Sequence, residues 1–329
     1  MANTDNRESL AVGGQAVMEG VMMRSKNALV LACRTPGGKI AISEQKWKTV
    51  FKTAILYKIP FLRGILIFAE TLVNGMGAIT LSANLQIRYS EDPDEKEEEI
   101  SGGSMVLVIG ISVAFALGLF VVLPHFLTAL TGLKASSLKF HLIDGIFKVS
   151  ILILYLWAIG LFKDMKRLFM YHGAEHKSIF AYEKGLELTV ENAKKCSRFH
   201  PRCGTSFLFL VLFISIFIFL VALRNQIVDN KWLDHLIKVG IKLPLMFPIA
   251  GIGYELIKLS GKHGEKAIFK PLVVPGLLLQ RLTTKEPDDE ILEVALASLK
   301  RTLWREEHPE AETSEEIVLY DDLEHISAS

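Results

Sequence analysis

Histidine and cysteine side chains are concentrated in one short window, residues 172–203. The chain holds 9 His and 3 Cys in 329 residues, and three of the His and two of the Cys lie in this window. The sequence HGAEH, which begins at His172, places the imidazole of His176 one helical turn further along the same face. His200 and Cys203 follow with the two-residue spacing of a zinc knuckle in which a histidine replaces the first cysteine. The window therefore predicts a metal site.

Zn²⁺ is the ion that suits a mixed histidine and cysteine site. The expected ligands are His172, His176, His200 and Cys203, with Cys196 as a substitute ligand. Glu175 completes the spacing H-x-x-E-H of the inverted zincins, in which the glutamate acts as general base on a metal-bound water. Four protein ligands would make the site structural, whereas three would leave a water position and make it catalytic. The sequence offers ligands for both, and five-residue motifs also match by chance.

Four residues outside the window are candidates for supporting the metal ligands. Glu19 and Arg24 lie in the apolar stretch AVGGQAVMEGVMMR, where they must be satisfied by each other or by a ligand; a surface salt bridge is the alternative. Tyr254 and Glu255 lie near the end of the last long apolar segment. The alternative for Glu255 is an interfacial carboxylate that pairs with Lys258.

The apolar residues are distributed as in an integral membrane protein. The chain is 50% hydrophobic with a net charge of +1, which gives no footprint for nucleic acid. A helix needs roughly 20 apolar residues to cross a bilayer. We therefore expect a mainly α-helical, polytopic membrane protein with about four spans in contact with the lipid bilayer; a homo-oligomer or a membrane-protein partner stays open. The expected spans are residues 105–130, 140–162, 205–223 and 237–259.

Three further segments have other signatures. Two β-prone runs flank a Pro-Gly-Gly turn in residues 28–45, which predicts a small cytoplasmic β-hairpin. Charged residues and glycines interrupt the apolar segment 49–87, which favours a pair of amphipathic helices on the membrane face, with a buried soluble helix as the alternative. Residues 271–280 are too short to span and are expected to be re-entrant or interfacial.

These segments predict an organisation in eight parts. They are a cytoplasmic N-terminal segment with the hairpin (1–48), interfacial helices (49–87), an acidic linker (88–104), two spans (105–162), a cytoplasmic metal-motif loop (163–204), two spans (205–259), an interfacial segment with an amphipathic helix (260–305), and an acidic disordered tail (306–329).

The orientation follows from the positive charges in the loops. The loop 163–204 carries nine Lys and Arg residues, whereas the loop 131–139 carries only Lys134 and Lys139. Positive loops stay in the cytoplasm, so the metal loop and, with four spans, both termini are expected there. The polar N-terminus shows no signal peptide, and the three cysteines fit a reducing compartment.

Four separate motifs resemble the YqhQ-like family of bacterial membrane proteins, which are described as predicted metal-dependent enzymes without an established reaction. The motifs are GGQAVMEGVMMR (13–24), YHGAEHK (171–177), HPRCGTSF (200–207) and PGLLLQRLTTKEPDD (275–289). The resemblance covers roughly residues 11–300. It implies a bacterial cytoplasmic (inner) membrane location and a metal at His172, Glu175, His176, His200 and Cys203. It implies no substrate.

Three functions are consistent with these features. The first is a metal-dependent membrane enzyme of hydrolase type that acts at the cytoplasmic face. The second is a scaffold or assembly factor in which zinc only fixes the loop. The third is a transporter or channel, which the broken segments 49–87 and 237–280 favour and the few ionisable groups within the long spans disfavour.

Overall fold

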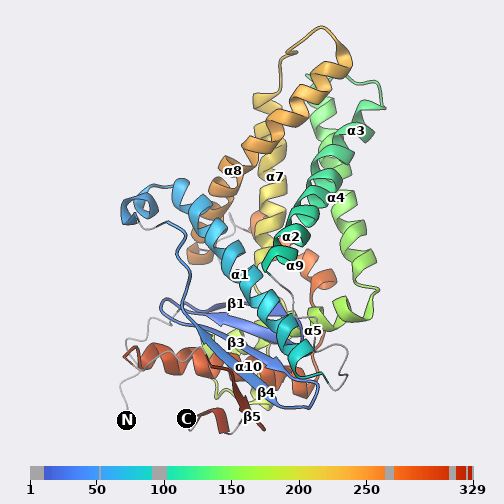
Figure 1. Ribbon diagram of the computed structural model, residues 1–329. Helices are drawn as coiled ribbons and strands as arrows, with labels where there is room; N and C mark the ends of the chain where they lie inside the picture. Colours follow the sequence, from blue (N-terminus) through green and yellow to red (C-terminus); the bar gives the residue numbers. More distant parts are fainter. Residues whose placement is uncertain are drawn as a thin grey trace.

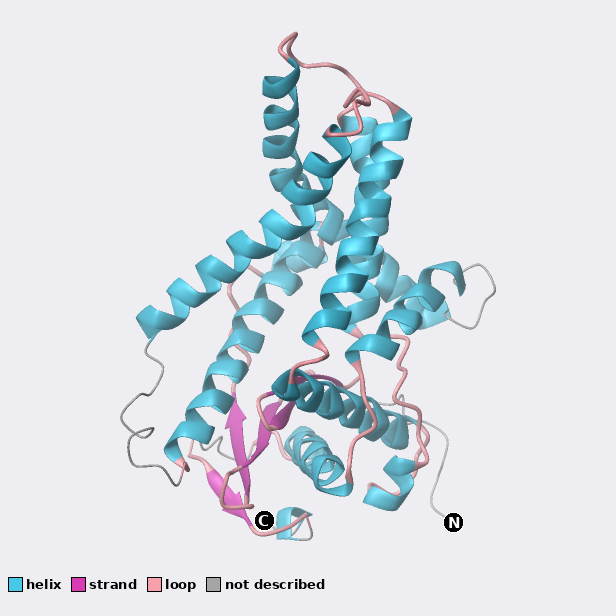
Figure 2. Ribbon diagram, turned by 90° about the vertical axis from the view of Figure 1, so that its right-hand side faces the viewer, coloured by secondary structure: helices cyan, strands magenta, loops and turns pink. Residues whose placement is uncertain are grey.

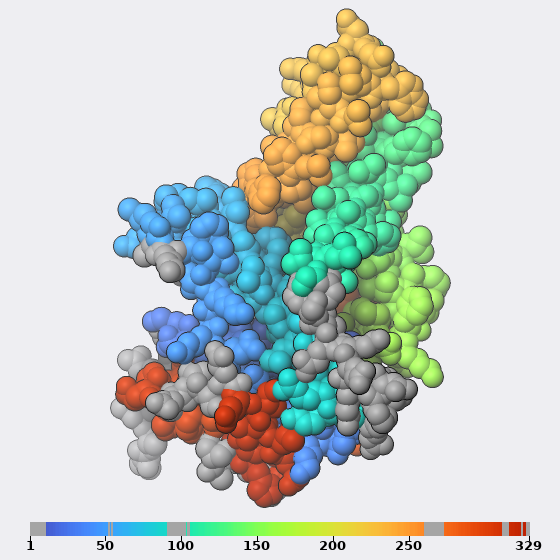
Figure 3. All heavy atoms as spheres, in the orientation of Figure 1, coloured from blue at the N-terminus to red at the C-terminus, as the bar shows by residue number. Residues whose placement is uncertain are grey.

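The chain folds into a small sheet with its covering helices and a bundle of long helices above it. The structure is a computed structural model that describes residues 11–51, 53–90, 102–263, 270–310, 316–323 and 325–327. The bundle stands as a narrow column on the broader base that the sheet and its helices form (Figures 1 and 3). The expectation of a mainly helical chain is confirmed.

The sheet is antiparallel and follows the chain order from β1 to β5. Its strands are β1 (Gly13–Val17), β2 (Gly20–Arg24), β3 (Leu29–Arg34), β4 (Ile40–Gln45) and β5 (Val318–Tyr320). The predicted hairpin is confirmed as β3 and β4, in which Arg34 pairs with Ile40.

The expectation of a disordered tail over residues 306–329 is wrong for its later part. The β-prone residues of β5 pair with Ile40–Ile42 at the edge that β4 would otherwise leave free. Residues 311–315 lie outside the described part.

Helices cover both faces of the sheet because strand side chains alternate between the faces. Helices α5 (Lys163–Glu183) and α10 (Asp289–Glu307) cover one face, where Val21 and Val30 pack with Leu292 of α10. The second half of α1 (Leu62–Arg88) covers the other face, where Leu85 packs with Leu31. Figure 2 shows helices on either side of the strands.

The four predicted apolar segments are all helical. The bundle contains α2 (Gly102–Leu117), a π-helical turn η3 (Gly118–Val122), α3 (Leu123–Ala129), α4 (Leu138–Ile159), α7 (Gly204–Ala222), α8 (Lys231–His263) and α9 (Lys270–Thr283). Shorter elements are η1 (Ala54–Lys58), α6 (Val190–Lys194) and η5 (His325–Ser327). Among the described residues, five helices are long and apolar enough to cross a membrane: α1, Val106–Ala129, α4, α7 and Lys231–Leu259.

The expectation of two helices over 49–87 is wrong, because α1 is continuous through most of this segment; the expected position on the membrane face stays a prediction. The residues that interrupt its apolar sequence make contacts and do not break the helix. Glu70 accepts hydrogen bonds from the indole of Trp47 and the amide of Val50. Gly64 lets α1 approach the backbone of Gly251 in α8.

Two expected segments remain, the acidic linker and residues 271–280. Most of the expected acidic linker (88–104) lies outside the described residues, which end at residue 90 and resume at residue 102 in α2. Residues 271–280 form the main part of α9, a helix of 14 residues. At 1.5 Å per residue, this helix is about 21 Å long, shorter than a hydrocarbon core.

Candidate metal centre

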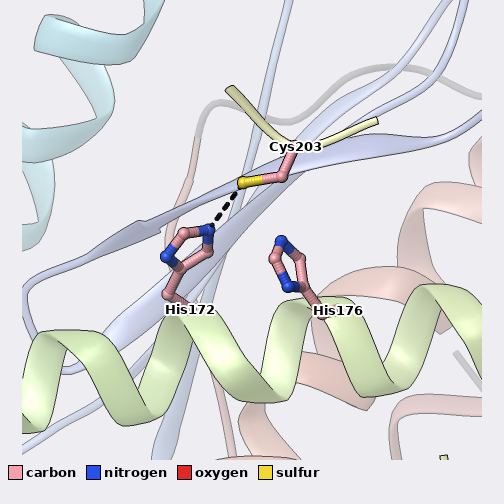
Figure 4. A group of neighbouring side chains, drawn as sticks. All are labelled: His172, His176 and Cys203. Atoms are coloured by element: carbon pink, nitrogen blue, oxygen red, sulfur yellow. Dashed lines mark hydrogen bonds between the residues drawn. The ribbon is translucent and has the colours of Figure 1, made fainter. Parts of the chain in front are cut away.

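Three side chains from the predicted ligand set converge on one point. His172 and His176 project from one face of α5 towards Cys203, the residue that precedes α7 (Figure 4). The Nε2 atom of His172 lies 3.1 Å from the Sγ atom of Cys203. One ligand atom from each of the three residues lies within 4.8 Å of the other two. Two histidines one helical turn apart and a cysteine at the start of the next long helix therefore form a compact His₂Cys group.

Backbone carbonyls fix which nitrogen of each imidazole faces the group. The Nδ1 atom of His172 lies 2.8 Å from the carbonyl oxygen of Thr283, and that of His176 lies 2.5 Å from the carbonyl oxygen of Arg198. A carbonyl only accepts, so each Nδ1 carries the proton and each Nε2 keeps its lone pair. The buried Nε2 of His176 has no hydrogen-bond partner among the described residues. This donor set fits a metal ion.

Electrostatics also favour neutral imidazole at His176, the form that binds metals. Burial lowers the pKa of His176, although the nearby Cys203 partly opposes this effect.

Helix α9 holds the knuckle segment in place. The amide side chain of Gln280 accepts a hydrogen bond from the backbone nitrogen of His200 and donates one to its carbonyl oxygen, both at 2.8 Å. The guanidinium of Arg198 donates to the hydroxyl of Thr284 at 2.9 Å. These bonds fix the backbone whose carbonyl at Arg198 orients His176.

Gly173 allows the segment after α9 to lie against α5. A Cβ atom at this position would overlap the carbonyl oxygen of Lys285. The amide of Lys285 donates to the carbonyl of Phe169 at 2.8 Å, one turn earlier on α5. This close approach brings the carbonyl of Thr283 to His172. The glycine of HGAEH therefore allows the contact that orients the imidazole of His172.

Glu175 lies beside the three converging residues. Its Oε2 atom is 4.0 Å from Nε2 of His172, and its side chain is 8% exposed. Burial raises the pKa of Glu175; the opposing effects of His172, His200 and a hydrogen bond from the Gly14 amide are smaller. A higher pKa makes a carboxylate a stronger base. A Cβ atom at Gly14 would lie 2.9 Å from Cγ of Glu175, so strand β1 closes one side of this carboxylate.

The structure places the two remaining predicted ligands outside the group. The Nε2 atom of His200 lies 3.3 Å from a carboxylate oxygen of Glu183, and its Nδ1 accepts from the amide of Arg202. Burial lowers the pKa of His200. The thiol of Cys196 donates to the carbonyl of Asn192 at 3.6 Å. The roles proposed for these two residues stay predictions.

The four candidate supporting residues have other partners. Glu19 contacts Arg167, and its second oxygen accepts from Tyr171 at 3.2 Å. The guanidinium of Arg24 lies 3.4 Å from the ring centre of Trp47. Glu255 pairs with Arg63, at 2.6 Å between Oε1 and Nε, and Tyr254 packs beside Gly64. Glu19 and Arg24 therefore do not pair with each other, and none of the four lines the cavity described next.

A cavity of about 420 Å³ opens where β1, α5 and the start of α7 meet. Its polar lining includes His172, Glu175, His176, Arg202 and Thr205, and its apolar lining includes Val12, Leu168, Phe169 and Ile179. The three converging residues and Glu175 thus border one space. This arrangement can hold an ion, a water and a base within reach of a small substrate group.

Sequence reasoning missed the residues that orient the ligands. Gln280, Thr283 and Lys285 belong to the motif at 275–289, and Gly14 belongs to the motif at 13–24. Both motifs supported the family resemblance, which was the only sequence signal for these positions. The orienting groups of Arg198 and Thr283 are backbone carbonyls, which leave no trace in residue type.

Comparison with known proteins gives a family without an assigned function. The family model "Protein of unknown function (DUF1385)" matches residues 59–305. The "Uncharacterized protein YqhQ" of Bacillus subtilis (strain 168) is 38% identical over 307 residues, which cover 89% of this chain and 92% of that protein. No solved structure matches the chain.

Proposed function

Since the chain belongs to the DUF1385 family of YqhQ-like proteins, whose function is not established, we propose its function from the geometry of the site. The proposed function is a metal-dependent enzyme of hydrolase type at a membrane surface. Zn²⁺ is held by His172, His176 and Cys203, and Glu175 is the general base.

One observation is the main support for a bound metal ion. The Nε2 atom of His176 is buried without a hydrogen-bond partner among the described residues. A buried polar nitrogen in this state costs about 1–3 kcal/mol. Its lone pair faces Cys203 and His172, so a cation at this point satisfies all three groups. A structural role for the imidazole alone leaves this nitrogen unexplained.

The chain supplies the other requirements of hydrolysis. When bound, Zn²⁺ activates water and polarises a carbonyl or phosphoryl oxygen. Glu175 presents a carboxylate oxygen to the same space, where it can take a proton from a water and return it to a leaving group. Arg202, whose guanidinium pairs with Glu183, also lies in the cavity lining, and the apolar side chains there limit access of bulk water.

The topology supports four membrane crossings. Strands β1 and β5 lie in one sheet and α5 packs on it, so the chain crosses an even number of times between these elements. Three of the five apolar helices lie between β4 and α5: α1, Val106–Ala129 and α4. One of them therefore does not cross. We assign this to α1, because its second half covers the sheet.

The positive charges of loop 163–204 support a cytoplasmic location for the sheet side in a bacterial cell. Cysteine labelling of intact cells with an impermeant maleimide tests this. Ser136→Cys and Gln226→Cys, in the loops farthest from the sheet, should react, whereas Lys58→Cys and Glu290→Cys should react only after permeabilisation. Reaction of Lys58→Cys in intact cells would mean that α1 crosses.

Metal analysis of the purified protein tests the ligand set. We expect about one zinc ion per wild-type chain and almost none in His176→Ala or Cys203→Ser, since loss of a ligand opens a three-ligand site. Cys196→Ser is the matched control and should keep the metal. Glu175→Gln should also keep it. A metal-free wild-type protein after purification without chelators would refute the proposal.

Cobalt substitution tests whether the site is open. Azide binds a Co²⁺ ion that has a free coordination position and changes its visible spectrum. We expect this change in the wild-type protein and in Glu175→Gln. An unchanged spectrum would mean that four protein ligands close the site.

A closed site would favour the second candidate, a scaffold with a structural zinc. One observation supports it: the three ligands join α5 to the start of α7, and Thr283 ties the segment after α9 to the same point. In that case His172→Ala and Cys203→Ser should lower the amount of folded protein in the membrane, and Glu175→Gln should change neither abundance nor function.

A further inference from the structure

The helix bundle buries a second group of ionisable side chains, far from the metal centre. They come from α3, α4 and α8, towards the end of the bundle opposite the sheet (Figure 1). The group is His125, His141, Asp144, Lys148, Asp234, His235, Lys238 and Lys242, and all eight are buried. Ionisable residues inside apolar helices are costly and usually functional. The few ionisable groups of the spans therefore gather in this part of the bundle, where they are buried.

Five of these residues form an unbroken chain of polar contacts. The Nδ1 atom of His235 lies 3.0 Å from Nε2 of His125, and Nδ1 of His125 lies 3.0 Å from Nζ of Lys242. Lys242 then contacts both oxygens of Asp144 at 3.2 Å. Asp144 contacts Lys148 at 2.8 Å. The chain links three helices and contains no step longer than a hydrogen bond.

The charges in this chain do not balance. Lys148 and Lys242 share the single carboxylate of Asp144. Asp234 and Lys238 form a separate pair at 2.9 Å. The group therefore holds one excess positive charge, and such a charge is unfavourable in an apolar bundle. Transfer of one proton out of the group removes the imbalance.

The hydrogen bonds define a direction for this transfer. An ammonium group only donates, so Nδ1 of His125 accepts from Lys242. The proton of His125 therefore resides on Nε2 and is donated to Nδ1 of His235. His141 also neighbours the group, and neither of its ring nitrogens has a hydrogen-bond partner among the described residues.

We propose that the bundle conducts protons through this chain. In the transfer step the Nζ–H bond of Lys242 breaks and an Nδ1–H bond forms on His125. At the same time the Nε2–H bond of His125 breaks and an Nδ1–H bond forms on His235. Lys242 becomes neutral, and the imidazolium of His235 releases its Nε2 proton at the end of the bundle. A proton that enters from the other side restores Lys242 through Asp144 and Lys148, and the two imidazoles, which now carry their protons on Nδ1, reorient before the next transfer.

Both ends of the chain support a continuous path. His235 lies in the first turns of α8, beside the loop that joins α7 to α8. At the inner end, Lys148 lines a cavity of about 190 Å³ that follows α7 from Phe219 to Leu208. Leu208 is one turn from Gly204, where α7 begins on the sheet side. The lining is apolar except for Lys148 and Ser215, so these two side chains are the groups that can hold water in this cavity. The π-helical turn η3 also lines it through Phe120 and Val121, and such turns are frequent at functional sites.

Proton flux into vesicles tests the proposal. The full-length protein is reconstituted into vesicles of phosphatidylethanolamine and phosphatidylglycerol that contain a pH-sensitive dye. A potassium gradient with valinomycin provides the driving potential. We expect internal acidification by the wild-type protein and about a hundredfold slower acidification by His125→Phe, which removes the transferring imidazole. Asp144→Asn is a second variant that should lose flux.

The matched control is Lys139→Gln, an exposed position on the same helix α4 that should conduct like the wild type. Equal elution from size-exclusion chromatography shows that each variant is folded. Wild-type flux no faster than that of protein-free vesicles, or unchanged flux in His125→Phe, would overturn the relay. So would acidification that follows an imposed chloride gradient, since the excess positive charge would then serve to bind anions. Metal-free protein should conduct as well as metal-loaded protein, so this result is independent of the proposed enzyme.

Discussion

The candidate metal centre and the charged chain in the bundle are both buried polar groups, but their atoms are arranged differently. At the candidate metal centre, two imidazole nitrogens that keep their lone pairs converge with the sulfur of Cys203 on one point. In the bundle, donors and acceptors alternate from Lys242 through His125 to His235. Converging acceptors need a cation, whereas alternating donors and acceptors can pass a proton. The same residue type, histidine, serves both arrangements because its two nitrogens differ in role.

The largest expected effect comes from removing one member of a charge pair in the bundle, and its size depends on which member is removed. Asp144→Asn leaves Lys148 and Lys242 without a counter-charge and should lower the free energy of unfolding by about 3–5 kcal/mol. Lys148→Met leaves one balanced pair and should change it by less than about 1 kcal/mol or increase it. Titration with sodium dodecyl sulfate in mixed micelles measures both. Equal losses for the two variants would mean that the excess charge is already neutralised.

The next effect concerns the close approach beneath the metal centre. Gly173→Ala places a methyl group against the carbonyl of Lys285 and should destabilise the fold by about 1–3 kcal/mol. Gly240→Ala in α8 is the matched control, because no atom lies within 4 Å of its Cβ position. The same unfolding titration compares them. If Gly173→Ala were as stable as the control, the segment after α9 would not constrain His172.

A smaller effect is expected from the residue that clamps the knuckle. Gln280→Leu removes both hydrogen bonds to the backbone of His200 and should weaken metal binding about 10-fold to 100-fold. Competition with a chromophoric chelator measures this affinity. Gln226→Leu, in the loop before α8, is the control and should bind metal normally. Proton flux should be the same in both variants, which would show that the two polar groups work separately.

The smallest effect is expected at Glu19, which the sequence placed near the metal. Its carboxylate pairs with Arg167, whose side chain is 42% exposed. Glu19→Gln should therefore cost less than about 1 kcal/mol and leave the zinc content unchanged. Thermal unfolding and metal analysis test both points. Loss of zinc in this variant would restore Glu19 as a support of the ligands.

The comparison also explains which parts of the molecule could be predicted from the sequence. The convergence of His172 and His176 could be predicted because helical spacing alone places them on one face. The apolar helices could also be predicted, because length and composition define them. His200 and Cys196 have the right residue types, but spacing does not determine which way a ring or thiol points. Glu183 and Asn192 engage them in the structure.

The chain of ionisable residues in the bundle could not be predicted from the sequence in this way. His125, Asp144 and Lys242 lie far apart in the sequence, and each reads as an isolated charge near the end of an apolar segment. Only the packing of α3, α4 and α8 brings them into contact. The continuity of helix α1 has a related cause, since its buried Glu70 is satisfied by Trp47 and Val50, which precede the helix.

The sheet that begins at residue 13 is completed only by residues near the end of the chain. One of its faces needs Ile291, Leu292 and Leu296 of α10, and its last edge needs β5. All the long apolar helices lie between these two parts in the sequence and are therefore synthesised before α10 and β5. A product that is truncated or clipped before α10 keeps an uncovered apolar sheet face and a free strand edge, both of which promote aggregation and proteolysis. Completion of the sheet and its helical cover therefore depends on synthesis of the chain through α10 and β5.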